Sequence, residues 1–358
     1  MCSSDLPAVA TAPSGPARAA LALPRPVRDE GRLRAGQIGL VINEDDPYSV
    51  AVGAHYLARR GLTEAQVLRV RVPRKARLER EEFAALRLRI EEHFGPQVQA
   101  LALAWRTPYA VQCQSITGAL ALGWQPGFCR SSCDAGPASP YFNHGTAQPF
   151  SRLGLRPSML LAAADVAQAR QMIDRGVASD GTLGRTFGTP SAAVFLRTPD
   201  AARNVRAPLF PEPGYLMARS LALRTLDAAS AGRQEDVVLL MTGTARLERL
   251  DQFGFVPGAL ADHLTSYGGV LDGSGGQSTA LEWIAAGATA SHGTVSEPCN
   301  HLQKFPLPPL LLGHYLQGVT ALEAYWKSVA WPLQSVFVGE PLAAPFARDV
   351  AEIGRAHV

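Results

Sequence analysis

The order of apolar and amphipathic segments constrains the fold of this chain more than any other feature. In the first third of the chain, short segments that are apolar almost throughout alternate with segments in which apolar residues recur at helical spacing. The predicted elements are a strand over 37–43, a helix over 48–60, a strand over 67–72, a helix over 78–94 and a strand over 98–105. Strands without polar alternation are typical of parallel sheets covered on both faces. We therefore predict an α/β fold of three layers, with helices on both faces of a mostly parallel sheet.

The alternation continues along the chain and favours a single α/β domain over residues 36–348. A chain of 358 residues, 47% of them hydrophobic, can bury a large core. Further strands are predicted over 159–163, 192–196, 236–241, 288–294 and 335–338, and further helices over 166–175, 277–286, 307–316 and 320–330. Residues 123–156 form a long stretch without a period, and a loop of this length is expected to be functional or pinned by disulfides.

Both ends of the chain differ from its body. Residues 1–35 are rich in Ala, Pro and Arg and lack a sustained period, which predicts a flexible leader. The DNA sequence TGCTCTTCCGATCT can encode residues 2–6, and DNA encoding residues 352–356 can contain its reverse complement. Such pairs come from sequencing adapters. We therefore expect residues 1–6 and 349–358 to be artefactual and an original signal peptide to be missing.

Charge and hydropathy argue against two classes of partner. The net charge of +3 is spread without a run of Lys or Arg, and basic residues mostly alternate with acidic ones. A surface for nucleic acid is therefore not expected. No apolar run reaches the roughly 20 residues that span a bilayer, so we expect no membrane span in this chain.

Four cysteines lie in the body of the chain. The spacing of Cys129 and Cys133, with no matching second pair, is a poor set of zinc ligands. Because both residues lie in the long irregular stretch, we predict that they form a disulfide, and that Cys113 lies near Cys299. The alternative is four unpaired thiols.

Glycines and small polar residues gather between residues 257 and 299, where the pattern predicts strand, loop, helix and strand. Glycines there allow positive φ and close approach of a ligand, and the predicted helix from Gln277 would point its N-terminus at them. We predict that the segment binds a ligand, with an anion or carboxylate as the natural guest, on a surface shared with residues near the ends of two early strands. The predicted binding residues are Gly268, Gly269, Asp272, Gly275, Gly276 and Gln277, together with Asn43 and Arg106.

Two nucleophiles are candidates for catalysis. Ser266 precedes glycines whose amides are suited to stabilising an oxyanion, with His263 close in sequence as a base, although the segment lacks the GxSxG pattern. Cys299 with His292 is the other pair, and a disulfide at Cys299 would remove it. The alternative for Ser266 is a polar glycine turn without chemistry. The spacing of His292 from its neighbours matches no helical zinc pattern, so neither a metal nor another cofactor is expected.

Five segments carry a resemblance to a known family. They read LVINEDDPYSVAVGAHYLARR, CRSSCDAGPASPYF, DHLTSYGGVLDGSGGQ, GATASHGTVSEPC and VFVGEPLAAPF, and they extend from about residue 38 to residue 346. Together they resemble an uncharacterised bacterial family found in organisms that carry the exosortase and PEP-CTERM protein-sorting system. The resemblance implies an exported protein of the periplasm or cell envelope, and it carries over no catalytic residue.

The chain also resembles, more weakly, the gingipain-type caspase-like peptidases. In those proteins a strand ending in a catalytic His precedes a strand ending in the catalytic Cys, and a Gly-Ala strand follows. That order places residues 242–244, Thr-Gly-Thr, at the histidine loop and Ser266 at the cysteine. The resemblance therefore implies a degenerate caspase-like scaffold that binds a peptide or glycan in the glycine-rich cleft. The alternative is a hydrolase that uses Ser266 or Cys299.

Overall fold

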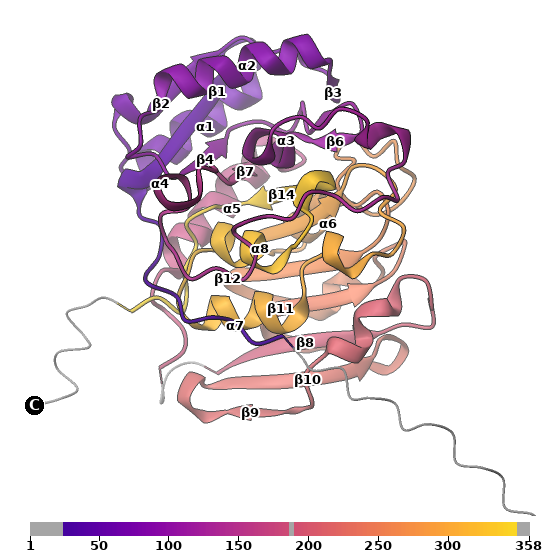
Figure 1. The fold of residues 1–358 in the computed structure, drawn as a ribbon. Coiled ribbons are helices and arrows are strands. Elements are labelled where there is room, and N and C mark those ends of the chain that lie inside the picture. Colours follow the sequence, from indigo (N-terminus) through magenta and orange to yellow (C-terminus); the bar gives the residue numbers. More distant parts are fainter. Residues whose placement is uncertain (1–23, 186–189, 349–358) are drawn as a thin grey trace, which may run out of the picture.

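The computed structural model describes residues 24–185 and 190–348. A sheet of 11 strands runs through the molecule in the order β2-β1-β4-β7-β14-β13-β12-β11-β8-β10-β9, and β3, β5 and β6 form a second, small sheet (Figure 1). The large sheet is mostly parallel, which confirms the predicted α/β fold. The predicted artefactual ends, 1–6 and 349–358, lie outside the described residues.

The strands and helices have the following bounds. The strands are β1 (Ile38–Asn43), β2 (Val67–Val70), β3 (Arg77–Leu78), β4 (Ala100–Leu103), β5 (Ala110–Val111), β6 (Gln114–Ser115), β7 (Ser158–Leu160), β8 (Ser191–Arg197), β9 (Gly214–Leu216), β10 (Leu221–Asp227), β11 (Gln234–Gly243), β12 (Phe253–Leu264), β13 (Ala290–Thr294) and β14 (Ser335–Gly339). The α-helices are α1 (Pro47–Arg60), α2 (Arg80–His93), α3 (Ile116–Leu122), α4 (Pro149–Leu153), α5 (Val166–Ser179), α6 (Ala280–Ala285), α7 (Pro308–Leu316) and α8 (Ala321–Ser328).

The large sheet consists of two halves of parallel strands with β14 between them. In the first half β2, β1, β4 and β7 are parallel to their neighbours, and in the second half β13, β12, β11, β8 and β10 are parallel to theirs. β14 pairs antiparallel with β13. Arg77, which follows β2, donates to the carbonyl oxygen of Val295, which follows β13, so the carboxyl ends of the two halves lie at the same edge of the sheet.

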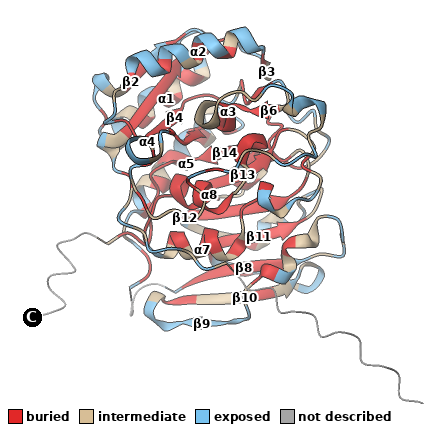
Figure 2. Ribbon diagram, viewed as in Figure 1, coloured by how far each residue is buried: buried red, intermediate tan, exposed pale blue. Residues whose placement is uncertain are grey.

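Helices cover both faces of the sheet, as predicted. Ile42 of β1 lies against Gly53 of α1, whereas Gly39 of the same strand lies against Phe94, which follows α2. Since residues 39 and 42 point to opposite faces, α1 and α2 lie on opposite faces as well. In the other half of the sheet, α8 packs on one face through Trp326 and Phe337, and α6 packs on the opposite face through Trp283 and His263. The strands between these layers are buried along most of their length (Figure 2).

Local signals explain where α1 begins and ends. The Asp46 carboxylate accepts a hydrogen bond from the Tyr48 amide, and Pro47 occupies the first turn. Gly61 then takes the left-handed conformation at φ 62°, which glycine adopts without strain. The bounds predicted for α1 were therefore correct to within one residue.

Residues 24–34, predicted as part of a flexible leader, instead pack across α7 and α8 (Figure 1). The Asp29 carboxylate accepts hydrogen bonds from Nδ1 of His314 at 2.8 Å and from Nζ of Lys327 at 2.6 Å, and all three side chains are buried. Leu33 joins the hydrophobic core. An acid and an apolar residue inside an otherwise featureless stretch thus help to fix this part of the chain, because the buried ammonium group of Lys327 on α8 needs a partner.

Candidate functional site

A cleft of about 480 Å³ lies beyond the carboxyl ends of β10, β8 and β11. These three neighbouring strands are parallel, and ligands of open α/β sheets bind beyond the carboxyl ends of such strands. The cleft is lined by residues that follow the three strands and by the start of β12: Leu196, Thr198, Pro199, Asp200, Ala228, Ala229, Ala231, Thr242, Thr244, Ala245, Arg246, Leu247, Glu248, Arg249, Leu250, Gln252, Phe253 and Trp283.

The base of the cleft is apolar. Leu196, Phe253 and Trp283 belong to a hydrophobic cluster beneath α6, and Trp283 is only 1% exposed. The indole Nε1–H of Trp283 donates to Nδ1 of His263 at 2.9 Å, so a buried hydrogen bond fixes the ring. The cleft therefore offers a ligand an apolar base.

The rim of the cleft carries exposed charges of both signs. Arg246, Glu248 and Arg249 follow β11, and within the described residues none of them forms an ion pair. Arg249 has a φ of 55°, a left-handed conformation that is strained for a residue with a side chain. On the other side of the rim, Asp200 is paired with Arg203 at 2.9 Å. Free opposite charges above an apolar base are suited to a ligand with both polar and apolar groups.

Hydrogen bonds connect this cleft to the glycine-rich segment. Arg203 Nε donates to Thr265 Oγ1 at 3.2 Å, and Thr265 donates to Gln277 Oε1 at 2.7 Å. Ser278 holds the wall of the cleft, since its amide donates to Ala245 O at 3.0 Å and its hydroxyl accepts from the Leu247 amide at 2.9 Å. The glycine-rich segment thus supports the cleft from behind.

Comparisons with protein-family models, with curated proteins and with solved structures find no match for this chain. The residues and their geometry are therefore what a functional assignment rests on.

Two of the predicted binding glycines have a packing role. Gly268 and Gly269 lie on Gly293 of β13, and a Cβ added at Gly269 would come within 2.6 Å of the Gly293 carbonyl oxygen. At the other end of the loop, Gly273 and Gly276 have φ values of 78° and 66°, as expected for a glycine turn. Gly275 lies against Tyr267.

The expected helix N-terminus at Gln277 is wrong. The helix α6 begins at Ala280, and its first turn is capped by Thr279 and Glu282. The Gln277 side-chain oxygen accepts from the Thr265 hydroxyl and from the Tyr267 amide. Both the helix amides and Gln277 are therefore engaged within the protein and leave no anion site at this point.

Asp272 binds within the protein as well. Its carboxylate accepts from the amide and hydroxyl of Ser274 at 3.0 and 2.7 Å, which closes a turn. The Tyr109 hydroxyl also donates to Asp272, and burial together with this negative charge raises the pKa of Tyr109 to about 12. The predicted contact between the glycine-rich segment and the chain after β4 is thus made by Tyr109.

The predicted binding residues Asn43 and Arg106 are engaged elsewhere within the protein. Asn43 ends β1 and Arg106 follows β4. Asn43 is fully buried and pairs with both backbone groups of Val72 at 2.8 and 3.0 Å. Arg106 donates to Ala164 O at 3.2 Å. Among the residues that follow β4, Tyr109 rather than Arg106 contacts the glycine-rich segment.

His263 does not serve Ser266 as a base. Both ring nitrogens of His263 are engaged: Nδ1 accepts from Trp283, so Nε2 carries the hydrogen and donates to Ser278 O at 3.0 Å. Burial lowers the pKa of His263 and keeps the ring neutral. Ser266 contributes its backbone carbonyl to the Thr294 hydroxyl at 2.9 Å.

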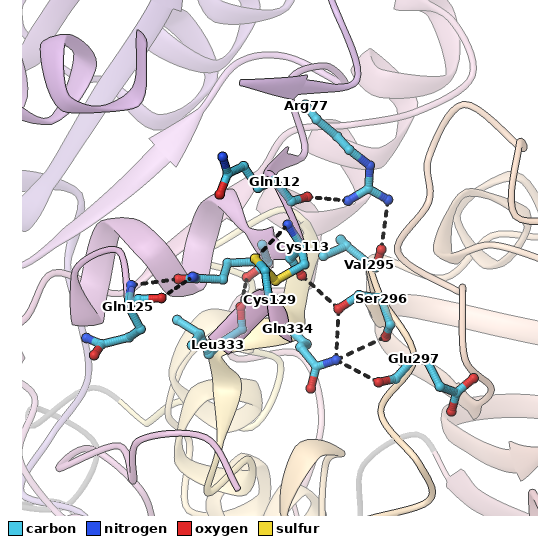
Figure 3. Close-up of a disulfide and its surroundings, with 12 residues drawn as sticks. Arg77, Gln112, Cys113, Gln125, Cys129, Val295, Ser296, Glu297, Leu333 and Gln334 are labelled. Atoms are coloured by element: carbon cyan, nitrogen blue, oxygen red, sulfur yellow. Dashed lines mark hydrogen bonds between the residues drawn. A yellow bond between two sulfur atoms is a disulfide. The ribbon is translucent and has the colours of Figure 1, made fainter. Parts of the chain in front are cut away.

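The cysteines pair differently from the prediction, and Cys299 is not a nucleophile. The disulfides join Cys113 to Cys129 and Cys133 to Cys299, so the predicted Cys129–Cys133 bridge is wrong. Each cysteine of the irregular loop is instead tied to a separate part of the chain. Around the first disulfide, Arg77 donates to Gln112 O and Val295 O, and Ser296 donates to Cys113 O at 2.7 Å (Figure 3).

His292 is part of a buried array that the sequence did not predict. Its Nδ1 faces Asp262 Oδ1 at 3.1 Å and its Nε2 faces Ser335 Oγ at 2.9 Å. This is the order of a Ser-His-Asp triad, but all three residues are 0% exposed and no substrate reaches the Ser335 hydroxyl. The three residues lie on adjacent strands β12, β13 and β14, so the array links the two halves of the sheet.

The Asp262 carboxylate also pairs with the buried guanidinium of Arg206, which donates to Thr242 O and Pro306 O. Burial alone would raise the pKa of Asp262, but Arg206 and the hydrogen bond from His292 outweigh it and hold the pKa at about 2. A permanently ionised Asp262 fixes the ring of His292 with a hydrogen on Nδ1.

Residues 24–185 and 190–348 contain neither a cluster of metal-ligating side chains nor a membrane-spanning helix. No three His, Cys, Asp or Glu side chains gather where they could hold a metal ion. None of the helices in these ranges has the length and hydropathy to cross a membrane.

Proposed function

We propose that this protein is an exported, non-catalytic binding protein whose cleft beyond β10, β8 and β11 holds a peptide segment. The observation that carries the proposal is the cleft itself, with its apolar base and the unpaired Arg246, Glu248 and Arg249 on its rim. A peptide supplies an apolar side chain for the base and charges for the rim, while its backbone groups suit Thr198 and Thr244.

A peptide fits this cleft better than a glycan. Sugars bind well where an aromatic ring offers a free face for stacking, and the two aromatic residues of the cleft do not. Phe253 is 9% exposed and Trp283 is 1% exposed, so neither ring has an open face.

The place of the cleft also supports a degenerate caspase-like scaffold. Thr242 and Thr244 line it, at the position where the gingipain-type order has its histidine loop, and Ser266 follows the next strand. The expected histidine and cysteine are replaced by residues with hydroxyl groups, which favours binding without peptide cleavage.

Two disulfides support export. Disulfides persist in oxidising compartments such as the periplasm and are rare in the cytosol. The periplasm or cell envelope is therefore the proposed location of the protein.

The proposal is tested by probing the oxidised protein with a peptide array and a glycan array. We expect peptides with an apolar residue flanked by charges to bind, and glycans not to bind. Ala229→Trp fills the cleft and should reduce peptide affinity at least tenfold, whereas Ala167→Trp on the exposed face of α5 should leave it unchanged. Arg246→Glu should shift the preference from acidic to basic flanking residues.

Two outcomes would contradict the proposal. Glycan binding that is lost in Ala229→Trp would identify a lectin. Labelling by a serine-directed activity probe that is lost in Ser266→Ala would instead favour the hydrolase alternative.

A further inference from the structure

The sheet ends at β2, and this end strand borders a second cavity of about 560 Å³. The groove is lined on one side by the consecutive residues 69–73 and on the other by α2. Its lining residues are Glu44, Arg69, Val70, Arg71, Val72, Pro73, Glu82, Ala85, Leu86 and Arg89. It lies at the opposite end of the sheet from the cleft beyond β10, β8 and β11 (Figure 1).

The backbone hydrogen bonds of residues 69–71 are made on one side only, toward β1. Val70 O accepts from the Glu44 amide at 2.9 Å, and both backbone groups of Val72 bind the Asn43 side chain, so residues 70 and 72 turn their backbone groups toward β1. Successive residues of a strand point their backbone groups to alternate sides. Arg69 and Arg71 therefore turn their N–H and C=O groups away from β1, toward the groove, where the described part of the chain places no further strand.

Asn43 keeps this edge straight past the end of β2. By replacing the next ladder bond with two side-chain hydrogen bonds, it holds residues 71 and 72 in the direction of the strand. The open edge is thus longer than the four residues of β2 itself. An edge of this kind is a template for another strand.

The charges of the groove select an acidic partner. Its two acids are engaged, since Glu82 pairs with Lys75 at 2.7 Å and Glu44 lies 3.6 Å from Arg71. Arg89 on α2 is exposed and forms no ion pair within the described residues. Arg69 pairs with Glu64 at 3.2 Å and Arg71 pairs with Asp45 at 2.7 Å. Arg89 is thus the cation that, among the described residues of the groove, has no acidic partner, and it favours an acidic ligand.

We propose that the groove between β2 and α2 binds an extended acidic peptide, which adds to the sheet as a further strand beside β2. Its backbone pairs with Arg69 and Arg71, and an acidic side chain contacts Arg89. The side chains of the peptide that point toward the groove lie over Ala85 and Leu86 of α2. This site is separate from the cleft of the proposed function and does not depend on it.

The probes are two labelled peptides, one that alternates Glu with Val and one that alternates Lys with Val. We expect the Glu-Val peptide to bind and to slow hydrogen exchange at the amides of Arg69 and Arg71. Arg89→Glu should weaken this binding on the order of tenfold and favour the Lys-Val peptide, while Arg170→Glu on exposed α5 should change neither.

Strand pairing itself is tested on the peptide, so that the protein fold is untouched. A strand presents alternate amides to its neighbour, so N-methylation of one alternating set of peptide amides should abolish binding and methylation of the other set should leave most of it. Arg69→Pro, which removes the outward N–H, should mimic the first result, and Arg69→Ala, which keeps that N–H, should not.

Several results would overturn the proposal. Equal tolerance of both N-methylated sets would exclude strand addition, and equal binding of the acidic and basic peptides would exclude the role of Arg89. Slower hydrogen exchange at the amides of β9, the other end strand, in place of residues 69–71 would show that the peptide pairs with the other end of the sheet. Loss of binding in Ala229→Trp would assign the peptide to the cleft of the proposed function.

Discussion

At the scale of single residues, two acids with buried side chains are each paired with a basic residue and a histidine. Asp262 pairs with Arg206 and His292 in the sheet, and Asp29 pairs with His314 and Lys327 beneath the N-terminal segment. Burying any one of these ions alone would cost several kcal/mol, so the partners are needed together. The candidate catalytic histidine His292 belongs to such a set, and this explains its burial without invoking chemistry.

Replacing Asp262 tests this reading. Asp262→Asn leaves the guanidinium of Arg206 buried without its anion and should lower the free energy of unfolding by about 3–5 kcal/mol at pH 7. Asp174→Asn removes a half-exposed acid paired with Arg59 and should cost at most about 1 kcal/mol. Urea denaturation of the oxidised protein measures both changes, and equal effects would contradict the argument.

The pH dependence of this difference has a fixed sign. The pKa of Asp262 falls from 3.8 to about 2 on folding, so the ionised group stabilises the fold above pH 4 and this contribution is lost as the pH falls toward 2. The gap in stability between the wild type and Asp262→Asn should therefore narrow over that range. A gap that stays constant down to pH 2 would show that the pKa of Asp262 does not fall on folding.

At the scale of elements, the glycine-rich segment is explained by the close approach of two backbones. The loop after β12 crosses the end of β13 at Gly293, and a Cβ at Gly293 would lie 2.1 Å from the carbonyl carbon of Gly268. Both contacting atoms are backbone, so neither can move aside. The glycines at this crossing are thus required by packing, and the cleft that the segment supports lies on its far side.

Substitution of these glycines separates packing from binding. Gly293→Ala should lower the free energy of unfolding by about 3 kcal/mol, because the methyl group meets fixed backbone. Gly36→Ala, where an added Cβ meets no atom within 4 Å, should change it by less than about 1 kcal/mol. Thermal or urea unfolding gives both values, and a tolerated Gly293→Ala would show that the loop can shift.

At the scale of the whole molecule, two disulfides tie the irregular loop to the sheet. Cys113–Cys129 spans 16 residues, and Cys133–Cys299 spans 166, joining the loop to the segment after β13. A cross-link that closes a longer loop removes more conformational entropy from the unfolded chain. The second disulfide should therefore contribute more to global stability, and the first more to local shape.

This ranking is measurable. Replacing both Cys133 and Cys299 by Ser should lower the free energy of unfolding by about 5 kcal/mol, and replacing Cys113 and Cys129 by Ser should lower it by about 3 kcal/mol. Urea denaturation of each pair variant, with the remaining disulfide kept oxidised, gives the comparison. The reverse order would mean that local contacts around Cys113 outweigh chain entropy.

The sequence by itself determined the α/β class, the parallel pairing of β1 with β4 and most strand and helix positions, because apolar periodicity and caps act over neighbouring residues. It located the glycine-rich segment but misassigned its role, since contact with Gly293 depends on a residue distant in sequence. Only the tertiary structure decided the cysteine pairing and the antiparallel junction of β13 and β14. It also decided the cleft beyond β10, β8 and β11, because the walls of the cleft come from segments that are separated in sequence and meet only when these strands pair.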